Sequence, residues 1–342
     1  MLIGHINLAS GFGGGEQQTF NLIKELATKG IKQKLLCRGP NRLAENALKL
    51  GIEVHYINHW AFRHLRNFDA DFWHAHDGKA VYWAALQHII HKTPYVITRR
   101  VDNPLSQNKF TRMAYRQASM VVCLSRAIEA KVKELDNEIK TTIIPSSYSG
   151  FNHFPQDKEK IKEEYKGKFL IGQVGALRKH KGQHITIKAA HLLQDLPDIH
   201  FLFLGDGPDR KELEEKAKNL TNVNFLGHKK NIGPYFAAFD LFIFPSLSEG
   251  LGSSILEAMQ AGVPVLASHT GGIPDIIEHA VTGWLIEPGD PVQLAQAIRH
   301  LYSNPELRTQ LATQASERLH KFSPQSIGKL YLELYRHIIS SK

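Results

Sequence analysis

Two glutamates that flank a glycine-rich turn are the residues of this chain best suited to chemistry. Glu249 and Glu257 follow an apolar run, Leu241–Phe244, which ends at Pro245. An apolar run that ends in proline predicts a buried strand, and the spacing of Ser254 and Glu257 predicts a capping box that starts a helix at Ser254. Glycine-loop amides and a helix N-terminus attract phosphate, while carboxylates accept hydrogen bonds from sugar hydroxyls. The segment therefore offers the groups that a nucleotide sugar needs.

Each of these residues also has a plainer explanation when it is taken alone. Glu257 alone fits the partner of a helix cap, and Glu249 alone fits a solvated loop acid. The joint pattern of both carboxylates around the glycine turn is more specific than either residue. We therefore treat Glu249 and Glu257 together as stronger evidence for a ligand site than either glutamate alone.

A second glycine loop lies near the N-terminus, at 11–16. A dinucleotide fingerprint would have glycine at its sixth position, where this loop has Glu16, so a nicotinamide site is disfavoured. The loop still joins a predicted strand to a predicted helix, which lets its amides approach an anion closely. A tight strand-to-helix turn is the alternative, and it would require only one of Gly13, Gly14 and Gly15.

The elements that must position these loops alternate between strand and helix along the whole chain. This alternation predicts parallel sheets covered on both faces, with ligands at the carboxyl ends of the strands. The expected strands are 2–8, 33–38, 54–57, 72–76, 95–99, 121–124, 142–144, 201–204, 223–225 and 241–244, with another that starts at Phe169. The expected helices are 16–28, 42–50, 80–91, 110–119, 183–193, 209–218 and 326–339.

The length and composition fit two globular domains. The chain has 342 residues, and single hydrophobic cores stop growing near about 250–300 residues. We expect an N-terminal domain at 1–160, a C-terminal domain at 161–322 and a final helix at 323–342, with the polar stretch Ser146–Lys168 as the linker. Cys37 and Cys123 lie in apolar runs, which favours buried free thiols. No apolar run is long enough for a membrane span, so we expect a cytoplasmic protein.

Positive charge is concentrated in the first half of the chain. The formal net charge is +9, and residues 1–150 hold 20 Lys and Arg against 12 Asp and Glu. Lys109, Arg112 and Arg116 recur at helical spacing within this half. No stacking aromatic motif accompanies them, so nucleic acid is a disfavoured partner. An anionic acceptor or the anionic cytoplasmic face of a membrane is the expected partner.

Taken in order, the motifs of this chain resemble the retaining glycosyltransferases of family 4, also called glycosyl transferases group 1. The resemblance covers essentially the whole chain and is densest from Gly172 to Pro288. It rests on the segments Gly13–Glu16, Gly175–Gly182, Phe201–Pro208, Val223–Gly227, Phe244–Glu257, Ala261–Ala267, Thr270–Asp275 and Thr282–Pro288. It implies the GT-B fold, an α/β architecture in which two Rossmann-like, doubly wound parallel-sheet domains face each other across a cleft.

The resemblance also assigns roles to residues. It implies that Arg178 and Lys181 bind the donor phosphates, that Glu249 lies by the donor sugar and that Glu257 accepts both ribose hydroxyls. Cations fixed at a departing diphosphate stabilise the transition state more than the ground state, which suits Arg178 and Lys181 as catalytic residues. The other residues implied at the donor are Gly14, Gly15, Gly227, His228, Gly250, Leu251 and Gly252.

The chain departs from the family at one expected position. Many members carry a histidine after the strand that corresponds to Tyr95–Arg99, whereas this chain continues with Arg99, Arg100 and then Asp102. We expect Arg99 or Arg100 to contact the transferred sugar or an anionic acceptor, Arg112 to bind the acceptor and Asp102 to accept its proton, with loop charges of no catalytic weight as the alternative. The Arg-Arg-x-Asp-x-Pro run is similar to that of enzymes that build lipopolysaccharide core and related envelope glycans.

Two patterns that are typical of metal sites are given little weight. Asp69 and Asp71 form an Asp-x-Asp, but a fold of parallel sheets offers that motif no matching site. His74 and His76 lie two apart on one predicted strand, and zinc would require further ligands. A buried or cleft-lining histidine is the favoured interpretation. We expect no metal and no cofactor.

These inferences together predict a retaining, metal-independent glycosyltransferase. We expect it to move a hexose or heptose from a nucleotide diphosphate sugar to an anionic envelope glycolipid, such as lipopolysaccharide core, with peripheral contact to the inner membrane. Two alternatives stay open: a non-catalytic subunit or sensor that binds nucleotide sugars, and a sugar-nucleotide epimerase of the same fold. An epimerase lacks the paired glutamates, and a sensor would bind the donor without turnover.

Overall fold

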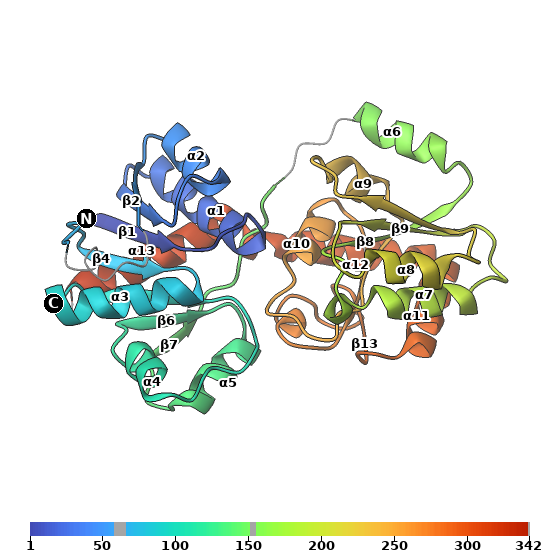
Figure 1. Ribbon diagram of the computed structural model, residues 1–342. Helices are drawn as coiled ribbons and strands as arrows, with labels where there is room; N and C mark the ends of the chain where they lie inside the picture. Colours follow the sequence, from blue (N-terminus) through green and yellow to red (C-terminus); the bar gives the residue numbers. More distant parts are fainter. Residues whose placement is uncertain (58–65, 151–154, 341–342) are drawn as a thin grey trace. The chain divides into compact units, whose positions relative to one another are not determined.

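The chain folds into two compact units that are joined by two crossings. The computed structural model describes residues 1–57, 66–150 and 155–340 (Figure 1). The first unit comprises Met1–Ser149 together with Lys321–Lys342, and the second comprises Gly150–His320. The expected boundary at 160/161 is wrong, because it would cut through a helix at Pro155–Glu164 (α6) that packs on a helix of the second unit.

The first unit is built on a sheet of parallel strands. Their bounds are β1 Leu2–Asn7, β2 Lys32–Cys37, β3 Glu53–Tyr56, β4 Phe72–Ala75, β5 Tyr95–Arg99, β6 Met120–Cys123 and β7 Thr141–Ile143. They lie in the order β3-β2-β1-β4-β5-β6-β7. The strand order reverses direction between β1 and β4, and in doubly wound sheets the loops at such a point form the ligand crevice.

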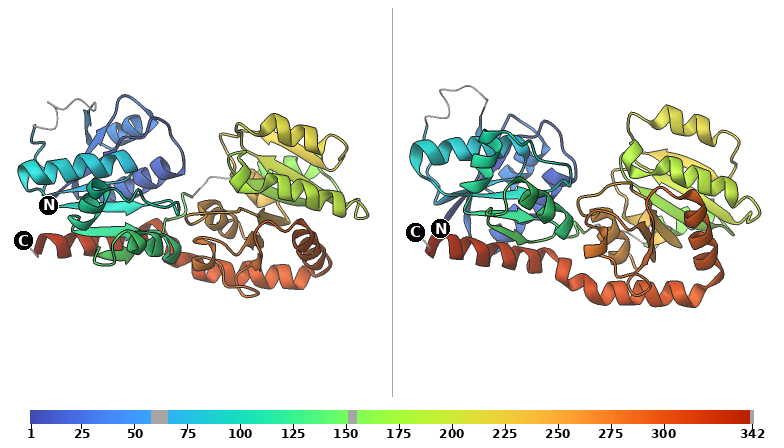
Figure 2. Two further views of the ribbon diagram at one scale, coloured as in Figure 1. Left: turned by 60° about the horizontal axis from the view of Figure 1, so that its bottom comes forward. Right: turned by 90° about the horizontal axis from the view of Figure 1, so that it is seen from below.

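Helices of the first unit pack on this sheet. Their bounds are α1 Gly14–Thr28, α2 Arg42–Lys49, α3 Gly78–His91, α4 Lys109–Arg116, α5 Arg126–Leu135 and α13 Pro324–Ser340. The final helix α13 follows a short 3-10 turn at Leu319–Phe322. Figure 2 shows α13, in red, lying along the strands of the first unit.

The C-terminal helix is part of the core of the first unit. Tyr331 and Tyr335 of α13 are at most 3% exposed and pack with Ile3, Leu26 and Phe72. α13 follows the second unit, Gly150–His320, in the sequence and packs against α1 of the first unit. The first unit is therefore discontinuous in sequence.

The second unit repeats the same architecture. Its strands are β8 Phe169–Val174, β9 Ile199–Leu204, β10 Val223–Gly227, β11 Leu241–Phe244, β12 Val265–Ser268 and β13 Trp284–Ile286, in the order β10-β9-β8-β11-β12-β13. Its helices are α6, α7 Gln183–Leu192, α8 Arg210–Ala217, α9 Gly233–Ala238, α10 Ser253–Gln260, α11 Pro291–Ser303 and α12 Pro305–Arg318, with 3-10 turns at Lys179–Lys181 and Ile273–Asp275. Here the order reverses between β8 and β11.

Each predicted strand and helix in the described residues is present, with its ends shifted by a few residues at most. The stretch proposed as a linker contains α6, whose sequence Pro-Gln-Asp-Lys-Glu-Lys is polar because most of the helix faces solvent. Cys37 and Cys123 are buried free thiols, as predicted, and burial raises the pKa of Cys37 to about 11 and that of Cys123 to about 12. None of the described helices has the length and apolar character that crossing a membrane requires.

Candidate active site

The loops after β8 and β11 bring the predicted cations and carboxylates of the second unit together. These two strands are neighbours at the point where the strand order reverses. Arg178 and Lys181 follow β8, and Glu249 follows β11, so all three lie at the carboxyl edge of the sheet. Neighbouring parallel strands end at the same edge, which is why residues 68 positions apart in sequence meet here.

Lys181 and Glu249 form an ion pair. The Lys181 Nζ donates to Glu249 Oε2 at 2.5 Å, and the two side chains are 22% and 16% exposed. Lys181 Nζ also lies 5.3 Å from the centroid of the Phe244 ring. Solvent and salt screen a partly buried ion pair less than a surface pair, so each of these two side chains restrains the position of the other. The ammonium keeps further N–H donors for an anion.

The backbone of Lys181 is held from within the sheet. Gln173, near the end of β8, donates from Nε2 to the Lys181 carbonyl at 2.9 Å and accepts from Thr186 Oγ1 at 2.7 Å. The next residue, Gly182, has φ +76°, and a Cβ there would lie 1.9 Å from the Pro245 carbonyl oxygen. Only glycine allows this close approach of the two loops.

A third loop supports the backbone of Glu249. Gly272 N–H donates to the Glu249 carbonyl at 2.9 Å, and Thr270 Oγ1 donates to the Leu247 carbonyl at 3.2 Å. Gly271 has φ +54°, and a Cβ there would lie 1.9 Å from the Glu249 carbonyl oxygen. The Thr270–Gly272 motif therefore holds the backbone of the loop that carries Glu249.

The helix α10 begins at Ser253 with an open N-terminus. The prediction of a capping box from Ser254 to Glu257 is wrong: the N-cap is Gly252, with φ +93° and no side-chain hydrogen bond to the helix. Gly250, Leu251 and Gly252 are buried. Because no side chain among the described residues caps this end, the N-terminal N–H groups of α10 and its dipole can attract an anion.

Glu257 lies in the first turns of α10 with its carboxyl partly buried. Burial raises the pKa of Glu257 from its usual 4.5 to about 7. Within the part of the chain that the structure describes, its carboxyl has no hydrogen-bond or ion-pair partner. A desolvated carboxyl without donors is prepared to accept hydrogen bonds from hydroxyl groups of a ligand.

Arg178 is exposed and lines a hollow of about 260 Å³ beside α7 and α8. Lys179, His184, Asp209 and Glu212 also line this hollow. The lining groups carry both signs of charge, so the hollow itself does not select an anion. Arg178 is the N-cap of the 3-10 turn Lys179–Lys181, so both Arg178 and Lys179 connect the hollow to the loop of Lys181.

The loop after β10 places the other two residues predicted at the donor. Gly227 closes β10 with φ +68°, and its carbonyl accepts from the Gly205 N–H at 2.9 Å. His228 follows and is exposed. Because β10 and β9 are outer strands on the β8 side of the same sheet, this loop ends at the same edge as Arg178.

In the first unit, Gly14 and Gly15 open helix α1. The N-cap is Gly13, whose N–H donates to Glu16 Oε2 at 2.8 Å. Glu16 is thus the acidic partner that caps the helix, which explains why glycine does not occupy that position. A Cβ at Gly14 would meet open space, and one at Gly15 would lie 3.6 Å from Arg100 Cδ.

The two arginines after β5 have different environments. Arg99 Nη2 donates to the carbonyl and to Oδ1 of Asn103, at 2.6 and 2.8 Å, so it holds its own loop. Arg100 lies against the first turn of α1, and its Nη2 donates to His76 Nδ1 at 3.3 Å. Asp102 is partly buried on this loop, while Arg112 is exposed on α4. Three of the predicted acceptor residues, Arg99, Arg100 and Asp102, thus lie at the end of β5 and on the loop after it, and Arg112 lies on α4.

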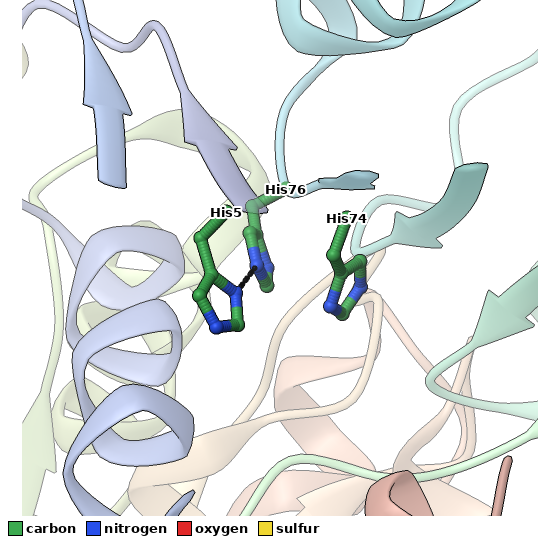
Figure 3. A group of neighbouring side chains, drawn as sticks. All are labelled: His5, His74 and His76. Atoms are coloured by element: carbon green, nitrogen blue, oxygen red, sulfur yellow. Dashed lines mark hydrogen bonds between the residues drawn. The ribbon is translucent and has the colours of Figure 1, made fainter. Parts of the chain in front are cut away.

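The predicted histidine pair joins a third histidine, His5 of β1. His5 and His76 are hydrogen-bonded through Nδ1 and Nε2 at 3.0 Å, while His74 stands on the other side of His76 (Figure 3). All three are at most 3% exposed, as the favoured interpretation of His74 and His76 required. One ring nitrogen from each histidine lies within 4.8 Å of the others, so the distances alone would allow the three to bind one metal ion.

Protein partners already occupy the ring nitrogens of these histidines. His5 also bonds to Gln33 Oε1 at 3.0 Å. His74 bonds to the Tyr335 hydroxyl and to Thr98 Oγ1, both at 2.6 Å. With the contact from Arg100 to His76, each of the six ring nitrogens has a partner. The arrangement is that of a buried hydrogen-bond network.

Of the Asp-x-Asp, Asp71 accepts from the Leu2 N–H at 2.7 Å and so ties the start of β1. Asp69 has φ +45° in the turn before β4. The residues that sequence reasoning missed are Gln173 and Thr270 in the second unit and His5 and Gln33 in the first. Gln173, His5 and Gln33 lie inside strands, and Thr270 lies in a glycine loop. The one sequence feature that could have indicated the strand residues is a polar residue within an apolar run.

Comparison with known proteins agrees with this arrangement. The family model described as "Glycosyltransferase Family 4" matches residues 12–147, and the model described as "Glycosyl transferases group 1" matches residues 155–318. The chain is 27% identical to the lipopolysaccharide core biosynthesis glycosyltransferase LpsD of Rhizobium meliloti (strain 1021) over 98% of each chain. It is 28% identical to LpsE of the same organism over 94% of this chain and 95% of LpsE.

The fold is also that of solved structures. The crystal structure of Anabaena HepE in complex with UDP superimposes with a TM-score of 0.89, at 24% identity, over 98% of this chain and all of HepE. The two parallel, doubly wound sheets are thus those of the GT-B fold, as predicted. The chain therefore belongs to glycosyltransferase family 4, as a GT-B glycosyltransferase related to those of lipopolysaccharide core biosynthesis.

Proposed function

We propose that this glycosyltransferase is retaining and metal-independent, and that it transfers a hexose or heptose from a nucleotide diphosphate sugar to an anionic envelope glycolipid such as lipopolysaccharide core. The observation that carries the proposal is the Lys181–Glu249 ion pair beside the open N-terminus of α10. It combines a cation for phosphate, a carboxylate for sugar hydroxyls and uncapped amides at one sheet edge. The relatives LpsD and LpsE support the choice of acceptor.

In this proposal the second unit binds the donor. Arg178, Lys181 and the first amides of α10 hold the diphosphate, and Glu249 accepts hydrogen bonds from the donor sugar. Glu257 accepts them from the ribose, and the loop at Gly227 and His228 contacts the base. HepE binds UDP and UDP-glucose in crystals, which supports a uridine donor as the first to test.

The proposed transfer is a substitution on one face of the sugar. The bond between the anomeric carbon and the phosphate oxygen breaks, and the acceptor oxygen bonds to that carbon on the same face. The acceptor hydroxyl loses its proton to Asp102, while the departing diphosphate keeps the electron pair. Lys181 and Arg178 stabilise the charge that develops on this leaving group.

The proposed acceptor is anionic because the first unit is strongly basic. Arg100 and Arg112 lie in this unit, at the end of β5 and on α4. Such a surface raises the local concentration of a phosphorylated lipid acceptor and favours peripheral contact with an anionic membrane. We therefore propose that the enzyme acts at the cytoplasmic face of the inner membrane.

The donor is tested first by thermal unfolding with uridine, guanosine, adenosine and cytidine diphosphate sugars. A ligand at 100 times its Kd adds about 2.7 kcal/mol to the free energy of unfolding, which raises Tm by several degrees. One nucleotide class should stabilise the wild type and not Glu257→Ala. An equal shift for both proteins would remove Glu257 from the proposed site.

The catalytic role is tested with Lys181→Met. This change should lower kcat by about 10²- to 10³-fold, as expected when one group that stabilises a developing charge is lost. Lys162→Met is the control, because Lys162 forms another partly buried ion pair, with Asp240, in the same unit. Equal kcat losses in the two variants would show that the effect is structural.

The stereochemistry and the metal are tested with the same assay. The anomeric coupling constant of the product should match that of the donor, and EDTA should leave kcat unchanged. An inverted product or loss of activity in EDTA that Mg²⁺ restores would contradict the proposal. Donor binding without any transfer to phosphorylated core oligosaccharide would instead favour the non-catalytic sensor.

A further inference from the structure

We propose that His76, His5 and Gln33 are positioning residues, which hold the Arg100 guanidinium in one orientation for an anionic group of the acceptor. The proposal rests on the proposed function, because it assumes that Arg100 meets the acceptor. It is carried by a hydrogen-bond chain that runs from Arg100 through two histidines to a glutamine and ends on the backbone of α1.

The chemistry of the two end groups fixes the direction in which every hydrogen bond of this series is donated. The Arg100 guanidinium can only donate, so His76 Nδ1 must accept at 3.3 Å. A neutral imidazole that accepts at Nδ1 carries its proton on Nε2, which therefore donates to His5 Nδ1 at 3.0 Å. By the same step, His5 Nε2 donates to Gln33 Oε1 at 3.0 Å. The Gln33 amide then donates to the Ile23 carbonyl at 3.1 Å.

Burial keeps the imidazoles of this chain neutral. It lowers the pKa of His5 to about 4 and that of His76 well below its usual value, and neighbouring His74 and Arg100 lower the latter further. Burial lowers the pKa of Arg100 from its usual value, and Tyr331, Glu16 and Tyr335 offset part of this effect. The pair formed by a guanidinium and a neutral acceptor thus persists across the physiological pH range.

The contacts of Arg100 leave several of its donors unpaired, of which the Nε–H is buried. His76 engages one N–H of the five that a guanidinium carries, and no other hydrogen bond of Arg100 is formed within residues 1–57, 66–150 and 155–340. Arg99, by contrast, is bound to Asn103 in its own loop. Arg100 is therefore the arginine of this pair that His76 holds and that keeps unpaired N–H donors on its Nη atoms.

The rest of the histidine cluster provides a control. His74 bonds to the Tyr335 hydroxyl and to Thr98, and neither of these residues joins the chain to Arg100. Tyr335→Phe removes a buried hydrogen bond of the same cluster and none of the hydrogen bonds that link Arg100 to Gln33. If the histidines serve only the stability of the core, His76 and Tyr335 variants should affect transfer alike.

The direction of the chain is tested by ¹⁵N spectroscopy of the imidazoles in the full-length protein. Both His5 and His76 should be neutral from pH 5.5 to pH 8, with the proton on Nε2. Gln33→Met should change the His5 signals, because it removes the acceptor at the end of the chain. A proton on Nδ1 of either ring would overturn the proposed direction.

The positioning role is tested with a phosphorylated core oligosaccharide and its dephosphorylated form as acceptors. His76→Leu should raise KM for the phosphorylated acceptor by about tenfold, the effect of losing one orienting hydrogen bond to a charged group. It should leave KM for the dephosphorylated acceptor and Kd for the donor unchanged. His76→Asn should restore most of the loss, since its amide oxygen replaces Nδ1 as the acceptor. Tyr335→Phe should behave as the wild type.

Equal effects of His76→Leu on both acceptors, or equal effects of His76→Leu and Tyr335→Phe, would overturn the positioning role. Failure of the proposed function is distinguishable, because the wild type would then transfer no sugar to either acceptor. In that event the ¹⁵N measurement still decides whether the hydrogen bonds from His76 through His5 to Gln33 are formed in the proposed direction.

Discussion

Glu257 connects proton binding to donor binding at the scale of one residue. Its pKa is raised to about 7, so the ligand-free protein holds a proton there below that pH. Ribose hydroxyls donate to the ionised carboxylate, so binding must release this proton. We predict that Kd for the donor falls by about tenfold per pH unit between pH 5 and pH 7, with a plateau above. Calorimetric titrations in two buffers of different ionisation enthalpy measure the released proton directly.

Glu257→Gln is the matched control for this pH dependence. Its amide does not titrate, so its Kd should be independent of pH over the same range. The stability of the ligand-free protein changes with pH in the opposite direction to donor affinity. Because the pKa of Glu257 is higher in the folded protein, the free energy of unfolding falls as the pH rises from about 4.5 to about 7. Glu257→Gln should lack that decline in Tm. A wild-type Kd that does not change with pH would show that Glu257 remains protonated in the complex.

The sequence predicted which residues would meet where a motif and a strand end coincide. Lys181 and Glu249 follow two apolar strands, and the parallel fold alone brings those strand ends together. His5 and Gln33 were missed, because their partners lie on other strands at separations of 71 and 28 residues. Only the sheet register decides such contacts, and a local pattern contains no signal for it.

At the scale of elements, the loop of Gly271 is expected to control the position of Glu249. A Cβ at Gly271 would lie 1.9 Å from the Glu249 carbonyl oxygen, so Gly271→Ala must move one of the two loops. We predict a loss of about 1–3 kcal/mol in the free energy of unfolding and a large loss of kcat. Chemical denaturation and a transfer assay measure the two effects.

Gly262→Ala separates backbone strain from displacement of Glu249. Gly262 has φ +71°, but a Cβ there would meet nothing within 4 Å. This variant should lose only about 1 kcal/mol, the cost of a left-handed alanine, and should keep the kcat of the wild type. If both variants kept full activity, the loop after β12 would have no part in positioning Glu249.

The docking of α13 on the sheet is a second feature at this scale. The Tyr335 hydroxyl is fully buried and bonds to His74 Nδ1 at 2.6 Å. Tyr335→Phe leaves that nitrogen without its partner, so we predict a loss of about 1–3 kcal/mol in the free energy of unfolding. Tyr302→Phe, in the second unit, is the control and should have a smaller effect, because Tyr302 is only partly buried. Urea denaturation compares the two variants.

Most elements were predicted because their apolar periodicity reflects burial on a parallel sheet. The exceptions have physical reasons. α6 has mostly exposed side chains, so its polar sequence resembles a linker. α10 begins at a left-handed glycine, and the Ser254–Glu257 spacing imitates a cap that the structure does not form. A local motif could not show that Gly252 replaces the capping side chain.

At the scale of the whole molecule, the charge is divided more sharply between the units than between the halves of the sequence. The first unit, with its returning helix, holds 24 Lys and Arg against 13 Asp and Glu, whereas the second holds 18 against 20. We predict that kcat/KM for a phosphorylated lipid acceptor falls several-fold between 50 and 200 mM salt, because exposed charges are screened. The Kd of the donor should change less over that range. An acceptor kcat/KM that is independent of salt would contradict electrostatic recruitment.

The division into two units predicts where donor binding will protect the backbone from hydrogen exchange. A nucleotide sugar held by Arg178, Lys181 and the start of α10 should slow exchange in the loops after β8 and β11. The resemblance of Gly13–Glu16 to the family's first glycine loop adds a second expectation, namely slower exchange at the start of α1. Slowing in both places would show that one donor engages both units, and that Gly14 and Gly15 belong to the site. Slowing confined to Gly150–His320 would limit donor binding to the second unit. The first glycine loop would then serve only as the start of α1, which Glu16 caps.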